Sequence, residues 1–474
     1  LDHLAEAWAA VMGPRGAAPL GEQPVVLTVP ASFDPAARDL TVEAAYAAGL
    51  EDVTLLEEPQ AALYAWIEAL GDEHRRHLRP GDVVLIVDVG GGTTDFSAVE
   101  VVDEAGSLGL RRVAVGDHIL LGGDNMDLAL AHHLREALES SGRQLDRLQM
   151  SALTHAARGA KERLLSSEVP SVPVALAGRG SALVGGALRT ELVRGDVERI
   201  VLDGFFPDVP LDAEPARRAR GALTQVGLPY AADPAVTRHL AAFLRRQAGA
   251  VSGRAAASLL CPTAVLFNGG VLKGRSIGER LVRTLSGWLA AAGAPPARLL
   301  PAGDLDLAVA RGGSYYGLVR RGRGVRIRGG TARGYYVGIE SPAPAVPGLA
   351  PPVTALCIAP FGMEEGTTAE LPPHELGLVV GEPVRFRFFG STVRRNDPAG
   401  ALLERWRPGE LEEAAPIEVT LPAEGRAEGD VVPVRLESQV TAVGTLLLEA
   451  VPLTPRVADE RWKIELSVRG DPTG

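Results

Sequence analysis

A glycine-rich segment directly after an apolar run carries the clearest chemical signal of the sequence. Residues 88–93 read Asp-Val-Gly-Gly-Gly-Thr, and residues 83–87 before them are all apolar. Backbone N–H groups of residues without a Cβ can approach an anion closely, and Asp88 at the strand end can hold a hydrated Mg²⁺ beside that anion. A flexible hairpin is the competing interpretation, which the flanking aspartates and the returning strand expected at 97–102 weaken. The residues predicted to hold the anion are Gly90, Gly91, Gly92 and, through its hydroxyl, Thr93.

A second candidate lies where an expected strand, residues 53–55, turns into a helix. Glu57 and Glu58 stand at this point, and Pro59 takes the first helical position. A carboxylate here can orient a water for attack on a phosphate. The alternative is that both glutamates only favour the helix N-terminus electrostatically, and the residues alone leave the two interpretations open.

Two further glycine turns could complete such a site. Residues 121–127 contain a tight glycine turn that leads into a capped helix, which by itself is ordinary structure. Gly269 and Gly270 follow Asn268 at the end of an expected strand, 264–267, and would let the backbone approach a flat adenine or ribose. A plain strand-to-helix turn explains this second segment equally well.

The charged and imidazole side chains on two of the expected helices give a weaker signal. Lys161 stands beside Glu162 and Arg163, so a solvated helix face is its default interpretation. His132 and His133 are interpreted as surface residues, because nothing nearby supplies a third metal ligand.

The composition of the 474 residues excludes several classes of protein. Cys261 and Cys357 lie far apart without a CxxC or Cys/His cluster, which excludes a structural zinc site and a disulfide scaffold and suits a reducing compartment. A net charge of −11 argues against nucleic-acid binding. P-loop, HExxH and GxSxG motifs are absent, and no run of 18 apolar residues predicts a membrane span. We therefore expect a cytoplasmic protein that binds neither nucleic acid nor membrane.

These candidate residues must be positioned by the elements around them. From residue 24 to about 316, short apolar runs alternate with longer helical stretches, which predicts an α/β domain. After residue 322, prolines and alternating strands predict a separate β domain of roughly 130 residues. The strands expected are 25–29, 53–55, 83–87, 97–102, 264–267, 353–359, 384–389, 417–421, 431–436, 445–450 and 463–468. The helices expected are 35–48, 61–70, 124–140, 150–165, 278–292 and 305–319.

In this order the segments resemble the Hsp70 family of chaperones, of the actin/hexokinase-like ATPase superfamily. Residues 26–33 look like the family's ITVPAYF strand and residues 88–93 like its DLGGGT loop. The further segments that resemble the family are 48–50 with 57–59, 121–127, 160–161, 267–273 and 306–310. The resemblance extends over residues 1–319 and is weaker beyond them.

The resemblance implies an α/β actin-like (ribonuclease H-like) ATPase domain of two lobes, followed by an all-β domain. Its ligands would be ATP or ADP with Mg²⁺. Glu58 would place the attacking water, Asp88 would hold the hydrated metal, and Thr93 would act with them in catalysis. Phosphates would be held by Gly90, Gly91, Gly92 and Thr93. Adenosine would be held by Lys161, Gly269, Gly270, Lys273 and Asp306.

The resemblance also implies a division of the chain. Residues 1–322 would be the nucleotide-binding domain, with an insert at about 205–256. Residues 323–334 would be the linker, and residues 335–474 a β-sandwich-like substrate-binding domain without a visible helical lid. The linker should fall near 325–331, where the chain reads Val-Arg-Ile-Arg-Gly-Gly-Thr. Because its arginines alternate, we expect that it cannot dock as an apolar strand does and that coupling between the domains is altered.

Several departures from the family pattern lead to further expectations. The family's first phosphate loop and catalytic lysine would precede Leu1, so we expect an N-terminally truncated chain with weak or absent hydrolysis. At the adenosine end, Arg158 stands where the family usually has Glu. Leu165 and Val271 stand where it has Ser, which puts the affinity for adenine in question.

Two functions follow from the sequence. The first is an Hsp70-like chaperone that couples ATP to the binding of unfolded or extended polypeptides, with a J-domain co-chaperone and a nucleotide exchange factor as further partners. The second is a non-catalytic interaction protein or scaffold of the same fold, with a degenerate nucleotide site. A sugar or acetate kinase of the superfamily is a third, disfavoured by the C-terminal β domain.

Overall fold

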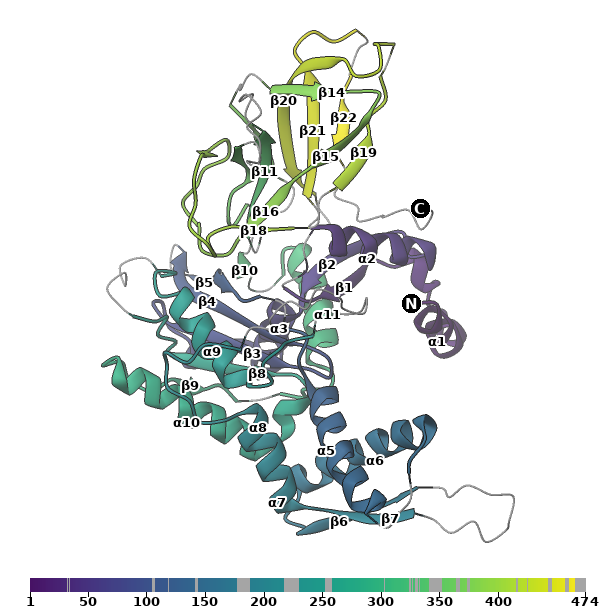
Figure 1. Ribbon diagram of the computed structural model, residues 1–474, viewed down its shortest axis with the longest axis vertical. Coiled ribbons are helices and arrows are strands. Elements are labelled where there is room, and N and C mark those ends of the chain that lie inside the picture. The colour runs from purple at the N-terminus through teal and green to yellow at the C-terminus, as the bar shows by residue number, and fades with distance from the viewer. Residues whose placement is uncertain are drawn as a thin grey trace. The chain divides into compact units, whose positions relative to one another are not determined.

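The computed structural model (Figure 1) divides into two compact units, which we describe separately. Unit 1 contains Leu1–Ala61, Gly109–Val115 and Gly313–Gly474, and unit 2 contains Ala62–Leu108 and Gly116–Gly312. No helix among the described residues is long and apolar enough to span a bilayer. The described residues are 1–31, 33, 35–104, 107–117, 119–140, 144–176, 188–216, 230–251, 258–301, 303–323, 325, 327–328, 331, 333–340, 352–363, 367–372, 376–414, 417–423, 425–441, 446–456 and 460–464.

Unit 2 is organised around four sheet strands in the order β4, β3, β8 and β9. β3 (Val83–Val89) is buried at every residue. It pairs antiparallel with β4 (Thr94–Glu104) and parallel with β8 (Ala264–Asn268), which in turn pairs parallel with β9 (Arg298–Leu299). A strand that is buried on both faces appears in the sequence as a continuous apolar run, which is why β3 could be predicted.

Helices cover this sheet, and one of them lies in the segment predicted to be an insert. α9 (Val236–Arg246) packs Phe243 against Phe96 of β4, with ring centroids 5.7 Å apart. The buried Asp233 accepts a hydrogen bond from the backbone N–H of Ala235 (2.8 Å) and so fixes the start of α9. α9 is therefore part of the core of unit 2.

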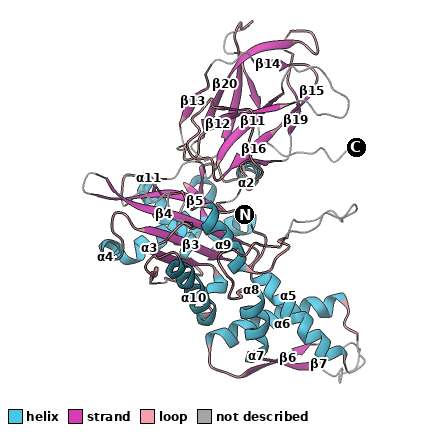
Figure 2. Cartoon of the chain, turned by 60° about the vertical axis from the view of Figure 1, so that its left-hand side comes forward, coloured by secondary structure: helices cyan, strands magenta, loops and turns pink. Residues whose placement is uncertain are grey.

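A second layer of unit 2 holds a helix pair above a β-hairpin (Figure 2). The pair consists of α5 (Gly123–Glu139) and α6 (Arg147–Ser166). α6 begins with a capping box, in which Asp146 Oδ1 accepts from the N–H of Gln149 at 2.7 Å. The remaining elements of the unit are α3 (Glu58–Leu70), which begins in unit 1, η3 (Gly71–Glu73), α4 (His74–His77), β6 (Ser171–Leu176), β7 (Leu188–Val193), α7 (Arg194–Val197), the π-helix η4 (Glu198–Leu202), α8 (Asp203–Phe205), η5 (Gly270–Lys273) and α10 (Arg275–Ala291).

The N-terminal part of unit 1 contains a parallel strand pair, β1 (Val25–Val29) and β2 (Val53–Glu57). Val29, Ala45 and Leu55 are buried together between this pair and α2 (Pro35–Ala47). The other helices of unit 1 are α1 (Asp2–Met12), η1 (Gly13–Arg15), η2 (Leu20–Glu22) and α11 (Ala308–Arg320), which begins in unit 2.

The segment predicted to be the linker contributes a strand to unit 1. β10 (Ile327–Arg328) pairs parallel with β5 (Ser107–Val115), and Ile327, opposite Leu110, is only 4% exposed. The expectation that this segment cannot dock as a strand is therefore wrong, because one buried isoleucine between the arginines is enough to anchor it. The backbone pairing itself does not depend on side-chain type.

The C-terminal part of unit 1 is all β among its described residues. One sheet has the order β17-β12-β11-β16-β18, another has β13-β20-β21-β22 with β14 on β20, and β15 pairs with β19. Leu356, Leu448 and Trp462 lie in their shared apolar core. The strands are β11 (Gly334–Glu340), β12 (Val353–Ala359), β13 (Thr368–Glu370), β14 (Leu376–Val379), β15 (Pro383–Phe386), β16 (Phe388–Ser391), β17 (Leu402–Leu403), β18 (Glu412–Glu413), β19 (Ile417–Thr420), β20 (Val431–Val440), β21 (Leu446–Pro452) and β22 (Trp462–Ile464).

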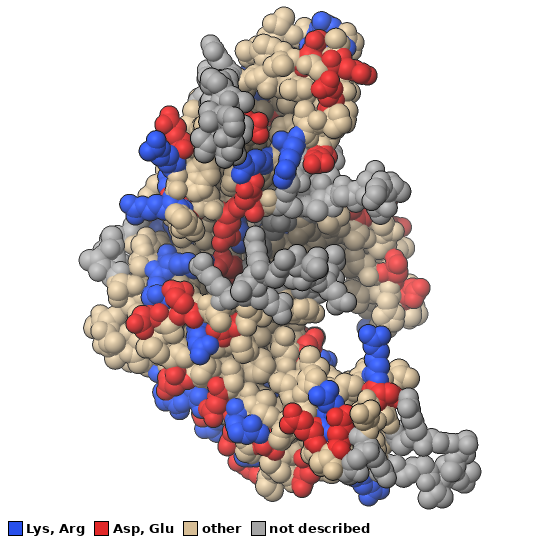
Figure 3. Space-filling view, in the orientation of Figure 1, with Lys and Arg blue, Asp and Glu red and all other residues tan. Residues whose placement is uncertain are grey.

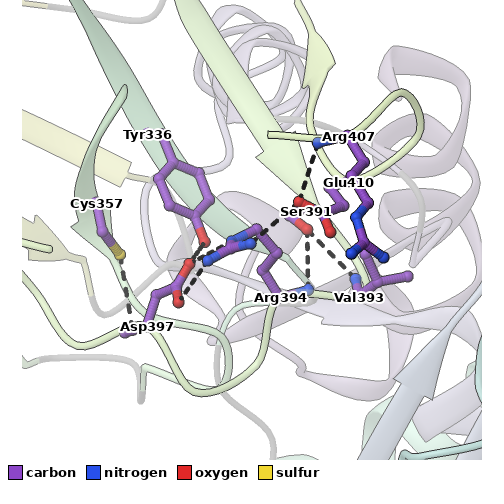
Figure 4. A network of polar contacts seen from close by, with 8 residues as sticks. All are labelled: Tyr336, Cys357, Ser391, Val393, Arg394, Asp397, Arg407 and Glu410. Carbon is purple, nitrogen blue, oxygen red and sulfur yellow. Dashed lines mark hydrogen bonds and ion pairs between the residues drawn. The ribbon is translucent and has the colours of Figure 1, made fainter. Parts of the chain in front are cut away.

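A polar cluster around Asp397 fixes a loop of this β part (Figure 4). Asp397 Oδ2 accepts hydrogen bonds from the Tyr336 hydroxyl (2.8 Å) and from Arg394 Nε (2.6 Å), and Arg394 also reaches Glu410 at 3.1 Å. Burial would raise the pKa of the Asp397 carboxyl, but the bonds from Arg394 and Tyr336 outweigh it and lower the pKa. Burial also raises the pKa of the neighbouring Cys357 thiol to about 12, so this thiol stays protonated.

Most expected elements are confirmed, and the exceptions have local causes. β1 and β12 match the expected strands to the residue. β5 was missed because two arginines interrupt its apolar pattern, and the hairpin β6–β7 and β11 were also not predicted as strands. The expected strand 384–389 is instead two strands, because Pro383–Phe386 pairs with β19 whereas Phe388–Ser391 pairs with β11 in another sheet.

The surface charge of unit 2 is mixed on the face that Figure 3 shows. Acidic and basic side chains alternate over the lower part of that view, where Figure 1 places α8 and α10. Neither sign gathers there into a continuous patch. Among the described residues of unit 2, exposed ion pairs such as Arg275 with Glu279 (2.7 Å) contribute little to stability.

Candidate functional site

Asp88 lies at the end of β3, directly opposite Asn268 at the end of β8. Both side chains are buried, and Asn268 Nδ2 donates a hydrogen bond of 2.7 Å to Asp88 Oδ2. Burial raises the pKa of Asp88 to about 6; the Asn268 bond opposes this shift, and the nearby Asp95 carboxylate adds to it. A buried carboxylate with such a shifted pKa is a candidate functional group.

The glycine loop 90–93 is the turn between β3 and β4, closed by a hydrogen bond from Gly90 N to Thr93 O of 2.9 Å. The start of α5 holds it in place: Gly123 N donates to Gly90 O (3.0 Å) and Asp124 N donates to Gly91 O (2.8 Å). The loop is thus a hairpin, as one interpretation expected, but the contacts with α5 fix its shape.

This anchoring leaves part of the loop open to a ligand. Gly91 and Gly92 are exposed, and within the described part of the chain their N–H groups donate to no protein acceptor. A Cβ at Gly122 would lie 2.5 Å from Gly91 O, so only glycine allows the close approach of α5 to the loop. Two free N–H groups on a fixed turn can bind a phosphate.

A cavity of about 450 Å³ opens beside this loop, within unit 2. Its walls come from the loop, the first turns of α5, one face of α6, and η5 with the start of α10. The lining residues are Gly91, Gly123, Asp124, Met126, Asp127, Arg158, Lys161, Glu162, Leu165, Ser166, Gly270, Val271, Lys273, Gly274, Ile277 and Asp306. The cavity has the size of a small-molecule site.

An ion cluster around the buried Asp127 lies in the α5–α6 wall of the cavity. Lys161, 6% exposed, lies 2.7 Å from Asp127 Oδ1, and Arg158 Nε lies 2.8 Å from Asp127 Oδ2. Arg158 also pairs with Asp124, and its bond to Asp127 raises the pKa of the guanidinium. The default interpretation of Lys161 as part of a solvated face is therefore wrong, because the side chain turns inward to the buried Asp127.

The glycine pair after β8 serves two different purposes. Gly269 has φ +89°, and a Cβ there would lie 2.3 Å from Val89 O. Glycine at this position therefore allows the chain that leaves β8 to pass close to the end of β3. Gly270 lines the cavity and has no atom within 4 Å of the Cβ position. Across the opening, Lys273 forms an exposed ion pair with Asp306.

The structure brings most of the sequence-predicted residues together. Those that line the cavity are Gly91, Lys161, Gly270, Lys273 and Asp306. The predicted residues that lie at the loop end of the cavity without lining it are Asp88, Gly90, Gly92, Thr93 and Gly269. Glu58 lies in unit 1 as the half-buried first residue of α3, so it is not part of the cavity in unit 2.

Two side chains of the site were not assigned a role from the sequence. Asn268 was considered only for its backbone, and Asp127 only as part of a turn. Asp127 could have been recognised from its position four residues after Gly123, on the buried face of α5. Nothing in the sequence alone indicated that Asn268 faces Asp88, because the two are 180 positions apart.

Glu57 has a structural role that separates it from Glu58. Its carboxylate pairs with Arg38 (2.7 Å) and with Arg112, and all three side chains are buried. It is the last residue of β2 and precedes α3, so the helix-terminus interpretation does not describe it. Of the two histidines expected at the surface, His132 is exposed, and His133 is half-buried beside Asp196 (3.0 Å).

The oxygen donors at the loop end fit a hydrated Mg²⁺. Among the described residues no group of three or more His, Cys, Asp and Glu side chains could hold a metal. Mg²⁺ keeps most of its waters and binds through one or two carboxylates together with substrate phosphates. Asp88 would supply the carboxylate, and next to it the buried Asn268 Oδ1 has no hydrogen-bond partner among the described residues.

Comparisons with known proteins find relatives for part of this chain. Residues 16–205 match the family model described as Hsp70 protein. The chain is 41% identical over 151 residues to the Chaperone protein HscA of Klebsiella pneumoniae (strain 342), covering 32% of this chain and 22% of that protein. It is 42% identical over 167 residues to the Chaperone protein HscA of Pectobacterium carotovorum (34% and 24%).

A third relative is the Chaperone protein HscA homolog of Acidithiobacillus ferrooxidans, 37% identical over 193 residues, which are 40% of this chain and 28% of that protein. The chain thus spans about a quarter of the length of the relatives that it matches. The family match includes the glycine loop, Asp88, Glu58 and the α5–α6 wall. By this match and these relatives, residues 16–205 of the chain are similar to the Hsp70 family.

Proposed function

We propose that this chain is part of an Hsp70-type chaperone, with an actin-like ATPase domain that binds Mg²⁺-ATP in the cavity of unit 2 and a β domain that binds extended polypeptide. The observation that carries the proposal is the fixed glycine loop between a buried carboxylate and a cavity of about 450 Å³, with two N–H groups that have no acceptor among the described residues. The bounds proposed are 1–322 for the ATPase domain, 323–334 for the linker and 335–474 for the β domain.

The residues of the cavity divide the nucleotide between them. Gly91 and Gly92 donate backbone hydrogen bonds to phosphate oxygens, and Thr93 can add its hydroxyl. Gly270 leaves room for the base or ribose to lie against the backbone of η5, while Lys161 with Asp127 keeps the α5–α6 wall rigid. Lys273 and Asp306 bound the open side of the cavity.

The catalytic roles follow from the chemistry of phosphoryl transfer. Hydrolysis exchanges the bond from the γ-phosphorus to the bridging oxygen for a bond to a water oxygen and yields ADP and phosphate. Such a reaction needs positioning and charge neutralisation rather than a covalent partner. Mg²⁺, when bound, would supply charge neutralisation at the phosphates. Asp88 would hold its hydration shell, and Glu58 would orient the attacking water.

The test of the chaperone function is ATP turnover in the intact protein, with and without an extended apolar peptide. We expect Glu58→Gln to lower turnover about 100-fold, as loss of a positioned base does, without changing nucleotide affinity. The matched control is Glu51→Gln, an exposed glutamate before β2. Unchanged turnover in Glu58→Gln would remove Glu58 from the mechanism.

A peptide measurement tests the coupling between the two activities. If ATP lowers the affinity for peptide, then peptide must lower the affinity for ATP by the same factor. Peptide would bind to the β domain by strand-like hydrogen bonds and an apolar pocket. Equal peptide affinities with ATP and with ADP would contradict the chaperone cycle, even where nucleotide binds.

One observation favours a second candidate, a non-catalytic scaffold with a degenerate nucleotide site. Several charged groups around the cavity pair with each other: Arg158 with Asp124 and Asp127, and Lys273 with Asp306. A ligand must compete with these pairs. Calorimetry decides between the candidates, because a scaffold of this kind would bind no Mg²⁺-ATP even at millimolar concentration.

A further inference from the structure

Asn268 occupies a position that the roles assigned above do not use. It is the last residue of β8, its Cα is directly opposite that of Asp88 in the parallel pair β3–β8, and it is 2% exposed. Its Nδ2 donates to Asp88 Oδ2 at 2.7 Å. The opposite orientation of the amide would set its oxygen against a carboxylate oxygen, so the chemistry fixes which end faces Asp88.

This orientation turns the amide oxygen away from its partner and leaves it unsatisfied. Asn268 Oδ1 is buried and accepts no hydrogen bond from the described residues. A buried amide oxygen without a donor is unfavourable, and such an atom in a folded protein calls for a water or an ion. Asp88, which is also buried, is next to it, and the buried Asp95 is directly opposite Asp88 in the antiparallel pair β3–β4.

The surroundings favour a hydrated divalent cation over a lone water. Asp88 with Asp95 concentrates negative charge at the loop end, and the donors present are carboxylate and amide oxygens, which hard cations prefer. The backbone after Asn268 is closely packed as well, because a Cβ at Gly269 would meet Val89 O and Asp88 Oδ1. The Cα of Asn268 is therefore held at a fixed place directly opposite Asp88.

We propose that Asn268 is a positioning residue of the divalent-cation site: its N–H holds Asp88 Oδ2, and its Oδ1 accepts a hydrogen bond from a water in the hydration shell of Mg²⁺. This inference rests on the proposed nucleotide function. It assigns to Asn268 a share of the affinity for the cation and none of the affinity for the nucleotide itself. Such an outer-shell partner typically changes metal affinity 10- to 100-fold.

The experiment separates the two affinities in the intact protein. The affinity for ATP is measured by calorimetry in EDTA, and Mn²⁺ binding to the protein–ATP complex is then followed by electron paramagnetic resonance. For Asn268→Ala we expect an increase of at least tenfold in the Kd for Mn²⁺ and less than a twofold change in the Kd for ATP in EDTA. An unchanged Kd for Mn²⁺ would overturn the role of Asn268.

The matched control is Thr263→Ala, at the other end of the same two strands. Thr263 Oγ1 donates to Asp82 Oδ1 at 2.7 Å, so this variant also removes a polar bridge between β3 and β8. It should leave both affinities unchanged. A loss of Mn²⁺ affinity in Thr263→Ala equal to that in Asn268→Ala would mean that sheet stability, rather than Asn268, sets the affinity, and would overturn the proposal.

Two further outcomes are informative. If Asn268→Ala fails to fold, Asn268→Ser keeps a donor and an acceptor on a shorter side chain, and an intermediate Kd for Mn²⁺ supports the proposal, whereas a wild-type Kd contradicts it. If the unmodified protein binds neither ATP nor Mn²⁺–ATP, the nucleotide function itself fails. Normal binding in the unmodified protein with an unaffected Asn268→Ala variant refutes the role of Asn268 alone.

Discussion

The carboxylate of Asp88 is the residue whose chemistry sets the character of the site. It is buried beside Asp95 and receives one neutral donor, the Asn268 amide. Burial beside a second carboxylate makes the ionised form of Asp88 unfavourable when no cation neutralises it. The resulting loss in the free energy of unfolding should be measurable when no cation is present.

Asp88→Asn should therefore stabilise the cation-free protein at neutral pH. The folded-state pKa of Asp88, about 6, lies above the ordinary value of 3.8, so the folded protein holds more protons between these values, and its free energy of unfolding falls as the pH rises through this window. We expect no difference between the variant and wild type at pH 3.5 and a gain of about 1–3 kcal/mol at pH 7.5.

Urea denaturation in EDTA across this pH range checks the prediction. The control is Asp212→Asn, an exposed aspartate in the same unit, which should change stability by less than about 0.5 kcal/mol at every pH. A destabilisation by Asp88→Asn that does not depend on pH would show that the carboxylate is a structural group.

At the scale of elements, the sequence predicted those whose signal is local. β3 is a continuous apolar run, and α5 and α6 begin at glycine or capping signals, so their positions could be predicted. β5 was not predicted, because the partner that allows its Arg112 to be buried, Glu57 on β2, is distant in the sequence. The same limit explains Lys161 and Asn268, whose partners lie 34 and 180 residues away in the chain.

The Asp397 cluster gives a prediction for an element of the β part. Asp397→Ala removes the partner of Tyr336, which is fully buried, and the charge that faces Arg394 (Figure 4). We expect a loss of about 2–4 kcal/mol in the free energy of unfolding of the β domain, because the buried Tyr336 hydroxyl loses its acceptor and the half-buried Arg394 keeps only Glu410 as its partner.

Tyr336→Phe is the graded comparison for this cluster, since it removes only the hydroxyl and should cost about 1 kcal/mol. Guanidinium denaturation followed by tryptophan fluorescence measures both variants, because Trp406 and Trp462 lie in the same β part. Equal losses for the two variants would show that the hydroxyl alone accounts for the effect and that Arg394 contributes nothing.

At the scale of the whole molecule, the proposed chemistry divides between the two units. The glycine loop, Asp88 and the cavity belong to unit 2, whereas Glu58 and the β part belong to unit 1. The sequence motifs predicted both sets of residues, but motif order alone does not give distances between units. The nucleotide cavity can therefore be tested by itself, independently of turnover or peptide binding.

Gly270 offers the most direct test of the central claim, that this cavity binds Mg²⁺-nucleotide. Its Cβ position is open, so Gly270→Gln adds a side chain at the cavity wall without a clash, and Gly287→Gln makes the same change at an open position of α10 outside the cavity. By calorimetry with Mg²⁺-ATP, we expect saturable one-site binding by the unmodified protein and by Gly287→Gln. Binding should be at least tenfold weaker in Gly270→Gln, with an unchanged melting temperature. No binding by the unmodified protein at millimolar Mg²⁺-ATP, or equal binding by both variants, would contradict the claim.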